Sequence, residues 1–449
     1  MAKPFSPTIE FTVRRCQPEL VAPAKPTPHV VKLLSDIDDQ ASLRFQIPLF
    51  FFYPHKPSMA RKDPAKLIKK ALAKTLVFYY PFAGRLREGP GRKLMVDCNE
   101  EGVIFIEADA DVSLHQFGDP LKPPFPCFEE LLYNVPGSEG VTNCPLLLIQ
   151  VTRLKCGGFI FALRLNHTMS DGAGLVQFLK ALAEIAQGAC EPSIPPVWRR
   201  ELLIARDLPR ITCSHTEYDE VPNDDDDETR NEDMVYDSFF FGPNQLKAIH
   251  RLFPHHQHHQ NSTFEVLTAF IWRCRTIALR LEPHKEVRFM ATRNVRGIQS
   301  NPPLLPSGYY GNGFVFPAVV TTAGKLCRNS FGYALELVKK SKAMATVEYI
   351  QSAADLMVIK GRPSLTPLRA WAVSDVTRAG FEDVDFGWGK AIYGGPAMPG
   401  AGDFLGASFF VPHKNAKGEE GIVVPIFLPR KSMMIFMKEL ENNMIISKL

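Results

Sequence analysis

Two apolar strands, a short polar turn and an amphipathic helix follow one another directly between residues 144 and 186. The runs CPLLLIQVTRL (144–154) and GGFIFALRL (157–165) are almost continuously apolar, which is typical of strands covered on both faces of a sheet. The turn HTMSDG (167–172) comes next, and GAGLVQFLKALAEIA (172–186) then places apolar side chains at helical spacing. This order predicts a mixed α/β fold in which the turn lies at one end of a buried sheet.

The second half of the chain also mixes helices and strands. Ser262 and Glu265 form a capping-box pattern that predicts a helix to about Leu279. Further elements are expected as a helix at 330–344 and as strands at 286–294, 311–320, 405–412 and 421–428. The segment 191–236 is rich in proline and contains the acidic run NDDDDETRNED, which predicts a linker. We therefore expect two α/β domains, at 1–190 and 237–449, that pack on one another.

Charge and cysteine content exclude several classes of protein. The 449 residues include 52 Lys and Arg against 48 Asp and Glu, a net charge of +4, which is too balanced for a protein that mainly binds nucleic acid or an anionic membrane. The nine cysteines are scattered without a CxxC pair, which favours a reducing compartment. The N-terminal segment lacks the apolar core of a signal peptide, and no run approaches ~18 apolar residues. We therefore expect a soluble protein that is not exported.

His167 and Asp171 are the first candidates for chemistry, because their turn lies where a buried strand ends and reacting groups of α/β sheets tend to lie there. On these residues alone, a structural histidine is an equal alternative. Ser170 supplies the third residue type of a catalytic triad, but it lacks the GxSxG elbow and does not come from a separate segment, which disfavours a serine hydrolase. The stretch HHQHH at 255–259 is interpreted as a loop that binds metals adventitiously at most.

Two motifs together resemble the paired signatures of the plant BAHD acyltransferases: HTMSDG at 167–172 and DFGWG at 385–389. The segments YYPFAGR (79–85) and GYYGN (308–312) extend this resemblance over nearly the whole chain. Within the family, three further segments resemble the alcohol acyltransferases that make volatile esters, above all the benzyl alcohol benzoyltransferases. These segments are VRRCQPELVAPAKPTP (13–28), LSDIDDQ (34–40) and RKLMVDCNEEG (92–102).

The resemblance implies a fold like that of chloramphenicol acetyltransferase, with a channel between two domains that reaches His167 from both faces. It implies transfer of an acyl group from CoA to a small alcohol, with benzoyl-CoA and benzyl alcohol as the preferred pair, by a monomer that needs no metal or bound cofactor. An alcohol is a poor nucleophile, so a base must take its proton, and a neutral imidazole suits neutral pH. His167 is predicted to be that base. Acetyl or anthraniloyl transfer, with aliphatic or other alcohols, and a catalytically silent binding protein are the alternatives.

The resemblance gives the other candidate residues mainly structural roles. Asp171 is expected to orient the His167 turn through an ion pair with Arg296, and Asp385 to stabilise a turn far from the base. The donor for the charge that develops on the carbonyl oxygen stays open, because Ser374 and Asp375 stand where some relatives carry a tryptophan.

Four residues are candidates for binding CoA. The helix that begins at Ser262 and Thr263 presents backbone N–H groups to a phosphate, and Arg293 or Lys390 could add positive charge. An ordinary helix cap and surface cations explain these four residues equally well. Arg293 stands where other members of the family commonly carry an apolar residue. This difference leaves the assignment of Arg296 as the ion-pair partner of Asp171 partly open.

The sequence closes with Ser447, Lys448 and Leu449, and a C-terminal S-K-L is an address read by the peroxisomal import receptor. We therefore expect a peroxisomal enzyme, with the cytoplasm as the alternative. Shortening of a cinnamoyl-CoA side chain to benzoyl-CoA is β-oxidation chemistry of the kind that peroxisomes house. A peroxisomal location thus favours benzoyl-CoA as the acyl donor.

Overall fold

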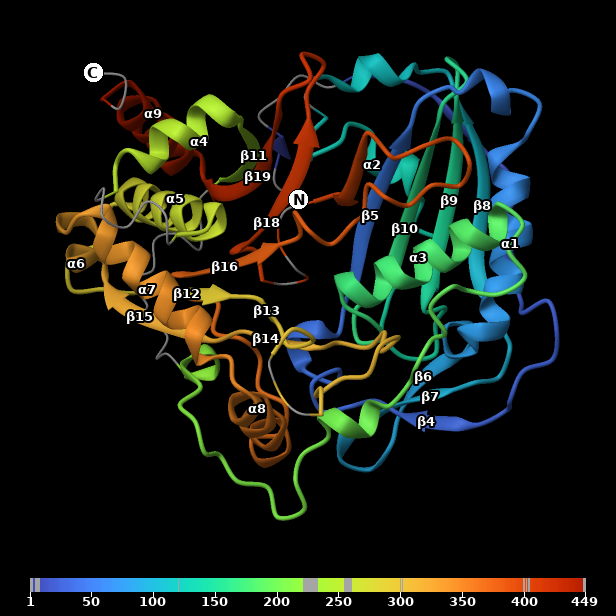
Figure 1. Ribbon diagram of the computed structural model, residues 1–449, viewed down its shortest axis with the longest axis horizontal. Helices are drawn as coiled ribbons and strands as arrows, with labels where there is room; N and C mark the ends of the chain where they lie inside the picture. The colour runs from blue at the N-terminus through green and yellow to red at the C-terminus, as the bar shows by residue number, and fades with distance from the viewer. Residues whose placement is uncertain are drawn as a thin grey trace.

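The computed structural model describes residues 3–4, 9–119, 121–220, 233–253, 261–298, 300, 302–398, 400, 402 and 404–446. The protein has two halves that lie side by side, each built on a mixed sheet with helices packed against it (Figure 1). The predicted fold class, two mixed α/β domains, is confirmed. The acidic run up to residue 232, the HHQHH stretch and Ser447 to Leu449 lie outside the described residues.

The first half is organised around a sheet that contains the two strands predicted at 144–154 and 157–165. Antiparallel pairs join β5 to β10 and β10 to β9, whereas β9 and β8 run parallel. In spatial order the strands are β17 (Tyr393–Pro396), β5 (Gln46–Tyr53), β10 (Phe159–Asn166), β9 (Leu147–Leu154), β8 (Val103–Ala110) and β2 (Val13–Arg15), and β3 (Glu19–Val21) also pairs with β8.

Two helices pack together against this sheet. Helix α1 (Pro64–Phe78) begins at the N-cap Asp63, whose side chain accepts from the backbone N–H groups of the first turn, with proline at the first helical position. Helix α3 (Gly172–Ala186) has the predicted bounds, and Leu175, Phe178 and Leu182 on its inner face are buried. A short helix, α2, spans Phe128–Leu131. The turn HTMSDG therefore connects β10 to α3, as expected.

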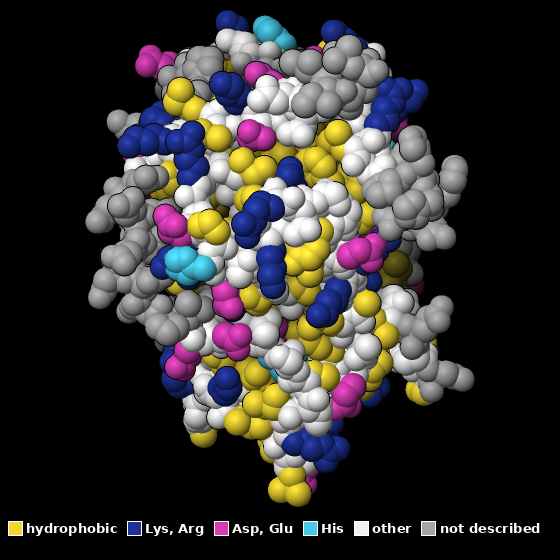
Figure 2. Space-filling model, turned by 90° about the vertical axis from the view of Figure 1, so that its left-hand side faces the viewer, with side chains coloured by type: hydrophobic (Ala, Val, Ile, Leu, Met, Phe, Trp, Pro, Cys, Tyr) yellow, Lys and Arg dark blue, Asp and Glu magenta, His cyan; other side chains and the backbone are white. Residues whose placement is uncertain are grey.

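The second sheet lies in the other half and is also mixed. Its central strands β12, β16 and β18 are parallel, and β18, β19 and β11 are antiparallel. In spatial order the strands are β1 (Lys3–Pro4), β11 (Met234–Phe241), β19 (Glu420–Pro429), β18 (Ala407–Lys414), β16 (Ala370–Asp375), β12 (Glu286–Ala291) and β15 (Ala318–Thr322). Basic and acidic side chains are interspersed on the outer face of this half (Figure 2).

Helices cover the second sheet as the sequence pattern predicts. Helix α5 (Thr263–Leu279) begins with the expected capping box, in which Ser262 and Glu265 bond each other's backbone N–H groups. The remaining helices of this half are α4 (Pro243–His250), α6 (Ala323–Arg328), α7 (Phe331–Met344), α8 (Val347–Ile359) and α9 (Arg430–Ile446). In the described part of the chain, every helix is too short or too polar to cross a lipid bilayer.

Two predicted strands are each broken in two. The strand expected at 286–294 ends at Ala291 and resumes as β13 (Arg293–Asn294), and the one expected at 311–320 divides into β14 (Phe314–Val315) and β15. Strands β13 and β14 pair with each other, so this part of the second half leaves its own sheet and reaches toward the first half. A small separate sheet contains β4 (Val31–Leu33), β7 (Leu94–Asp97) and β6 (Arg85–Glu88).

The segment that carries DFGWG is placed differently from the sequence prediction. We expected it in the C-terminal domain, but Phe386 and Trp388 are buried in the core of the first half, and the following strand β17 pairs with β5. Apolar contacts with Tyr53 and Phe159 of the first sheet explain this placement. The segment from Asp385 to Pro396 therefore completes the first half.

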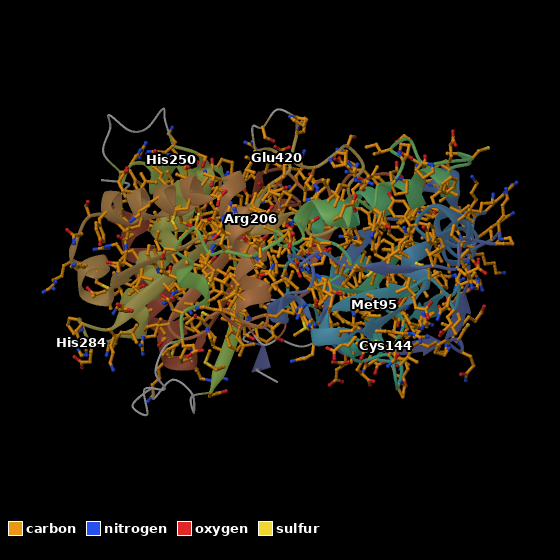
Figure 3. All side chains as sticks on the ribbon, turned by 90° about the horizontal axis from the view of Figure 1, so that it is seen from below. Met95, Cys144, Arg206, His250, His284 and Glu420 are labelled. Carbon is orange, nitrogen blue, oxygen red and sulfur yellow. The ribbon has the colours of Figure 1, made fainter. Side chains whose placement is uncertain are left out.

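The segment 191–220 is more than a linker. It contains two turns of 3-10 helix at Arg200–Leu203 and Thr216–Tyr218, and Arg200 and Glu217 are fully buried. Arg206 lies near the middle of the molecule in Figure 3, and its Nε lies 2.6 Å from Asp355 of α8. The described part of the predicted linker is thus bonded to the second half, and the exact domain boundaries stay a prediction.

Candidate active site

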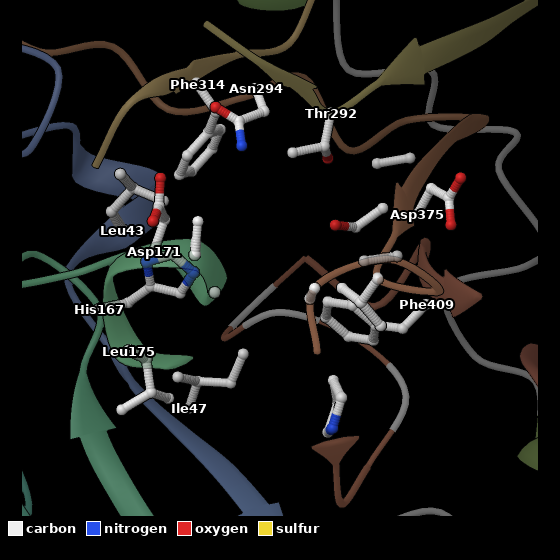
Figure 4. Close-up of a pocket in the computed structure, with 18 of the residues that line it drawn as sticks. Leu43, Ile47, His167, Asp171, Leu175, Thr292, Asn294, Phe314, Asp375 and Phe409 are labelled. Carbon is white, nitrogen blue, oxygen red and sulfur yellow. The ribbon is translucent and has the colours of Figure 1, made fainter. Parts of the chain in front are cut away.

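His167 lies at the C-terminal end of β10, where the chain turns into α3. Its backbone N–H donates to the Phe45 carbonyl at 2.9 Å, which ties the turn to the start of β5. The turn then leads to Asp171, the N-cap of α3, whose carboxylate accepts from Gly174 N–H at 2.8 Å. The half-buried imidazole faces a cavity between the two halves (Figure 4).

This cavity has a volume of about 370 Å³ and walls that are mostly apolar. The rings of Phe45 and Phe314 lie 5.3 Å and 5.9 Å from the imidazole, centroid to centroid. Apolar side chains from both halves line it: Leu43, Phe45, Ile47, Leu49, Leu165 and Leu175 from the first half, and Phe314, Phe316, Leu365, Val376, Phe381, Phe404 and Phe409 from later in the chain. A small organic substrate bound here would be largely shielded from water.

A buried amide fixes the proton of His167. Asn312 Oδ1 lies 3.2 Å from His167 Nδ1, while Asn312 Nδ2 donates to the His167 carbonyl at 2.8 Å and to Asp38 Oδ1 at 2.9 Å. Since the amide nitrogen has these two acceptors, its oxygen must face the ring and accept from Nδ1–H. The lone pair of the neutral imidazole is therefore on Nε2, which is available as a base.

Asp38 holds this amide at the junction of three segments. The carboxylate is fully buried and accepts from Asn312 N–H at 2.9 Å, from Arg200 Nη1 at 2.9 Å and from Ser35 Oγ at 2.6 Å. Arg200 in turn donates to the Met169 carbonyl within the turn. The His167 imidazole is thus oriented by Asn312 and Asp38, two residues to which the sequence prediction gave no role.

The pKa of His167 is lowered from its ordinary value because burial disfavours the charged imidazolium, an effect that Asp171 and Asn312 only partly oppose. The imidazole is therefore neutral and able to accept a proton at neutral pH. Protonation would remove the Nε2 lone pair, so activity must fall on the acid side.

We expect the acid limb of kcat/KM to have a midpoint below about pH 6.5, the ordinary pKa of histidine. The profile of kcat/KM against pH tests this directly, because it reports the ionisation of the free enzyme. A midpoint clearly above that value would contradict a desolvated base.

Asp171 and Arg296 form an ion pair between the two halves. Arg296 Nη1 lies 2.6 Å from Asp171 Oδ2, and Gly313 N–H donates to the same oxygen at 2.9 Å. Burial alone would raise the pKa of the Asp171 carboxyl, but Arg296 and the backbone donors of Gly174 and Gly313 hold it below its ordinary value. The carboxylate is committed to these partners, and no hydrogen bond joins it to His167 among the described residues.

The close approach of the two halves here requires a residue without a side chain. A Cβ added to Gly174 would lie 2.2 Å from the Tyr310 carbonyl oxygen. Ser170 Oγ donates to the same carbonyl at 2.7 Å. The GYYGN segment of the second half is thus docked on the first turn of α3.

Asp385 lies within its own turn. Its Oδ1 accepts from the N–H groups of Gly387 and Gly389, both at 2.7 Å, and both glycines have positive φ angles. Asp385 is not among the residues that line the cavity around His167. The Asp385 carboxylate is thus bonded within its own turn, and its structural role stays a prediction.

The four candidates for CoA binding do not line this cavity either. Ser262 Oγ caps its own helix, and Thr263 is the first residue of that helix. Lys390 Nζ pairs with Asp383 at 2.6 Å and lines a different cavity, and Arg293 lies on β13. Their assignment to CoA stays a prediction.

Within the described part of the chain, no group of three or more His, Cys, Asp or Glu side chains is placed to hold a metal ion. The nine cysteines are described, and all have free thiols. The cavity beside His167 thus presents an imidazole between mostly apolar walls.

Comparison with known proteins agrees with this geometry. The model of the Transferase family matches residues 11–443. Two benzyl alcohol O-benzoyltransferases, from Nicotiana tabacum and Petunia hybrida, are each 64% identical over 97% of this chain and 95% of their own length. The crystal structure of vinorine synthase shares the fold, with a TM-score of 0.70 and 21% identity over 96% of this chain and 98% of that chain. This chain therefore belongs to the BAHD acyltransferase family, as the two motifs had indicated.

Proposed function

We propose that this protein transfers a benzoyl group from benzoyl-CoA to benzyl alcohol and releases benzyl benzoate and CoA. The broader activity follows from the family: the chain is an acyl-CoA-dependent alcohol O-acyltransferase. The observation that supports the benzoyl and benzyl groups is the 64% identity, over nearly the full chain, to two enzymes named for this reaction.

The cavity supports aromatic substrates. The rings of Phe45 and Phe314 both pack near the His167 ring, and most of the apolar walls are Leu and Phe side chains. Aromatic rings pack on one another in offset and edge-to-face arrangements, and the transfer of a phenyl ring from water into such walls is favourable. Two phenyl groups can therefore be held near the base without any charged partner.

In the proposed mechanism, His167 Nε2 takes the hydroxyl proton as the alcohol oxygen attacks the thioester carbonyl carbon. The carbonyl then re-forms, the carbon–sulfur bond breaks, and the proton on His167 returns to the thiolate. Thiolate leaves readily, so no acyl-enzyme is needed and both substrates are bound together. Asn312 and Asp38 keep the imidazole in the tautomer that this sequence of steps requires.

A panel of purified-enzyme assays tests the substrates. Benzoyl-, acetyl- and anthraniloyl-CoA are each combined with benzyl alcohol and with aliphatic alcohols, and the esters are identified by mass. We expect the highest kcat/KM for benzoyl-CoA with benzyl alcohol. A higher value for an aliphatic alcohol or for another acyl group would reject the benzyl benzoate assignment, and a lack of any ester would favour the catalytically silent alternative.

We further propose that the enzyme is imported into peroxisomes, on the basis of Ser447, Lys448 and Leu449. A fluorescent protein fused ahead of the chain should collect in peroxisomes and should become cytosolic when these three residues are removed. A diffuse signal from both fusions would refute this localisation. We also propose that the enzyme is a monomer, which sedimentation of the purified protein can test.

A further inference from the structure

Polar side chains of the second half also line the mostly apolar cavity: Thr292, Asn294, Ser374, Asp375, Arg378 and Ser408. Asn294 is the last residue of β13, and its amide nitrogen points into the space beside His167 in Figure 4. The two residues come from different halves, so a substrate between them would contact both. Asn294 is on a strand pair, β13 with β14, that leaves its own sheet and reaches toward the first half.

Arg296 fixes the orientation of this amide. Asn294 Oδ1 accepts from the Arg296 backbone N–H at 2.9 Å, and Arg296 Nη1 lies 3.5 Å from the same oxygen. The oxygen is therefore held away from the cavity, and the two hydrogens of Nδ2 face it. Neither hydrogen has an acceptor among the residues that the structure describes.

The donor is held in place before any substrate binds. Arg296 bonds Asp171 at 2.6 Å and the Gly311 carbonyl at 2.6 Å, so its backbone is fixed between the two halves. Other groups on the cavity wall can donate as well, among them the Arg378 guanidinium and the hydroxyls of Thr292 and Ser374, which no hydrogen bond to a described residue stops from rotating. Compared with these two hydroxyls, the Asn294 amide has a set direction.

We infer that Asn294 Nδ2 is the donor that stabilises the oxyanion of the tetrahedral intermediate, an inference that rests on the proposed acyl transfer. When the alcohol oxygen bonds to the thioester carbon, the carbonyl π electrons move to the oxygen and His167 takes the alcohol proton. Asn294 is exposed before substrate binds, but a pre-oriented donor stabilises that charge because it needs no reorganisation as the charge forms. When the carbon–sulfur bond breaks, the electron pair returns to the carbonyl, and the oxyanion is discharged.

This assignment gives the Asp171–Arg296 pair a second consequence. The same Arg296 that pairs with Asp171 also holds the Asn294 oxygen, so the ion pair positions both the base turn and the oxyanion donor. Asp171 and Arg296 are positioning residues in this scheme. They act through His167 and Asn294.

Two substitutions test the inference in the full-length enzyme. Asn294→Ala should lower kcat by roughly 10²- to 10³-fold, the loss found when one oxyanion donor is removed, with KM values for both substrates nearly unchanged. Asn294→Asp keeps the size and the acceptor toward Arg296 but turns a negative oxygen toward the reacting carbonyl, so its kcat should fall at least as far. In Asn294→Ala the acid limb of kcat/KM should keep its wild-type midpoint, because the bonds of His167 are unchanged, whereas the added carboxylate of Asn294→Asp should raise the midpoint by favouring the imidazolium.

The carbonyl stretch of bound acyl-CoA, labelled with ¹³C at the carbonyl carbon, gives a readout that a merely structural role would not move. A hydrogen bond lowers this frequency, so the shift seen in the wild type should be lost in Asn294→Ala. The matched variants Thr292→Val and Ser374→Ala each remove one hydroxyl donor of the same wall and should each lose less than about 10-fold in kcat. A full effect in either of these, or unchanged kcat in folded Asn294→Ala, would overturn the inference.

The assay separates this inference from the substrate assignment. If the wild type makes an ester other than benzyl benzoate, the proposed substrates are wrong, and the Asn294 variants are then measured with the pair that the wild type uses. If Asn294→Ala raises KM for the alcohol and leaves kcat unchanged, the amide binds the alcohol and is not the oxyanion donor.

Discussion

Replacing His167 with alanine is expected to lower kcat by roughly 10²- to 10⁴-fold, the usual contribution of a positioned general base. Nothing else that lines the cavity can take the alcohol proton with equal ease: Asp171 is tied to Arg296 and two backbone donors, and Asp375 accepts from the backbone and side chain of Thr377. The truncation removes ring contacts with Phe45 and Phe314 but no buried ion pair. The variant should therefore fold and should bind CoA almost as the wild type does.

Turnover is measured with benzoyl-CoA and benzyl alcohol, and thermal unfolding and CoA titration show that the variant is intact. A histidine far from the cavity provides the control. His284 is an exposed residue at the far end of the second half (Figure 3), and His284→Ala should retain wild-type turnover. Wild-type turnover in a folded His167→Ala enzyme would show that the base is elsewhere.

The β10–turn–α3 unit could be predicted from the sequence because its signals are local. Continuous apolar runs specify buried strands, and helical periodicity specifies α3, so the position of His167 at a strand end follows from neighbouring residues alone. The helix that begins at Thr263 was predicted for the same reason, since a capping box is a pattern of four adjacent residues.

The orientation of the base could not be predicted, because it depends on residues that are distant in sequence. Asp38 and Asn312 are separated by 274 positions, and their bond forms only once the two halves dock. Asp38 belongs to LSDIDDQ, whose three aspartates are typical of a segment exposed to solvent, yet the Asp38 carboxylate is buried against Arg200. A signal for these contacts would have required knowledge of which residues vary together.

The DFGWG segment was misplaced for a related reason. Sequence position places residues 385–389 with the second half, but their aromatic side chains pack in the hydrophobic core of the first half. No local sequence pattern specifies in which of two cores an aromatic side chain is buried. The break at Pro317 was missed because the apolar run continues through it, and the break at Thr292 falls where the apolar residues of β12 give way to polar ones. These breaks create the β13–β14 pair that carries Asn294 into the cavity.

Asp171→Ala is expected to lower the free energy of unfolding by about 3 kcal/mol and to lower kcat as well. Removal of one partner of a largely buried ion pair leaves the other charge uncompensated, at a cost of about 3 to 5 kcal/mol, and the 21% exposure of the Arg296 side chain favours the lower end. The N–H groups of Gly174 and Gly313 lose their acceptor at the same time, so α3 loses its N-cap. The loss of kcat follows because the base turn is no longer held to the second half.

Denaturant unfolding of the wild type and the variant measures the first effect, and kcat at saturating substrates measures the second. Asp171→Asn should recover part of the stability, because its side-chain oxygen can still accept from the two backbone donors, whereas its missing charge leaves Arg296 unpaired. The matched control is Asp233→Ala, which breaks an ion pair with Arg430 that is exposed on both sides and should cost less than about 1 kcal/mol. If Asp171→Ala were no more destabilising than Asp233→Ala, the pair with Arg296 would not hold the two halves together.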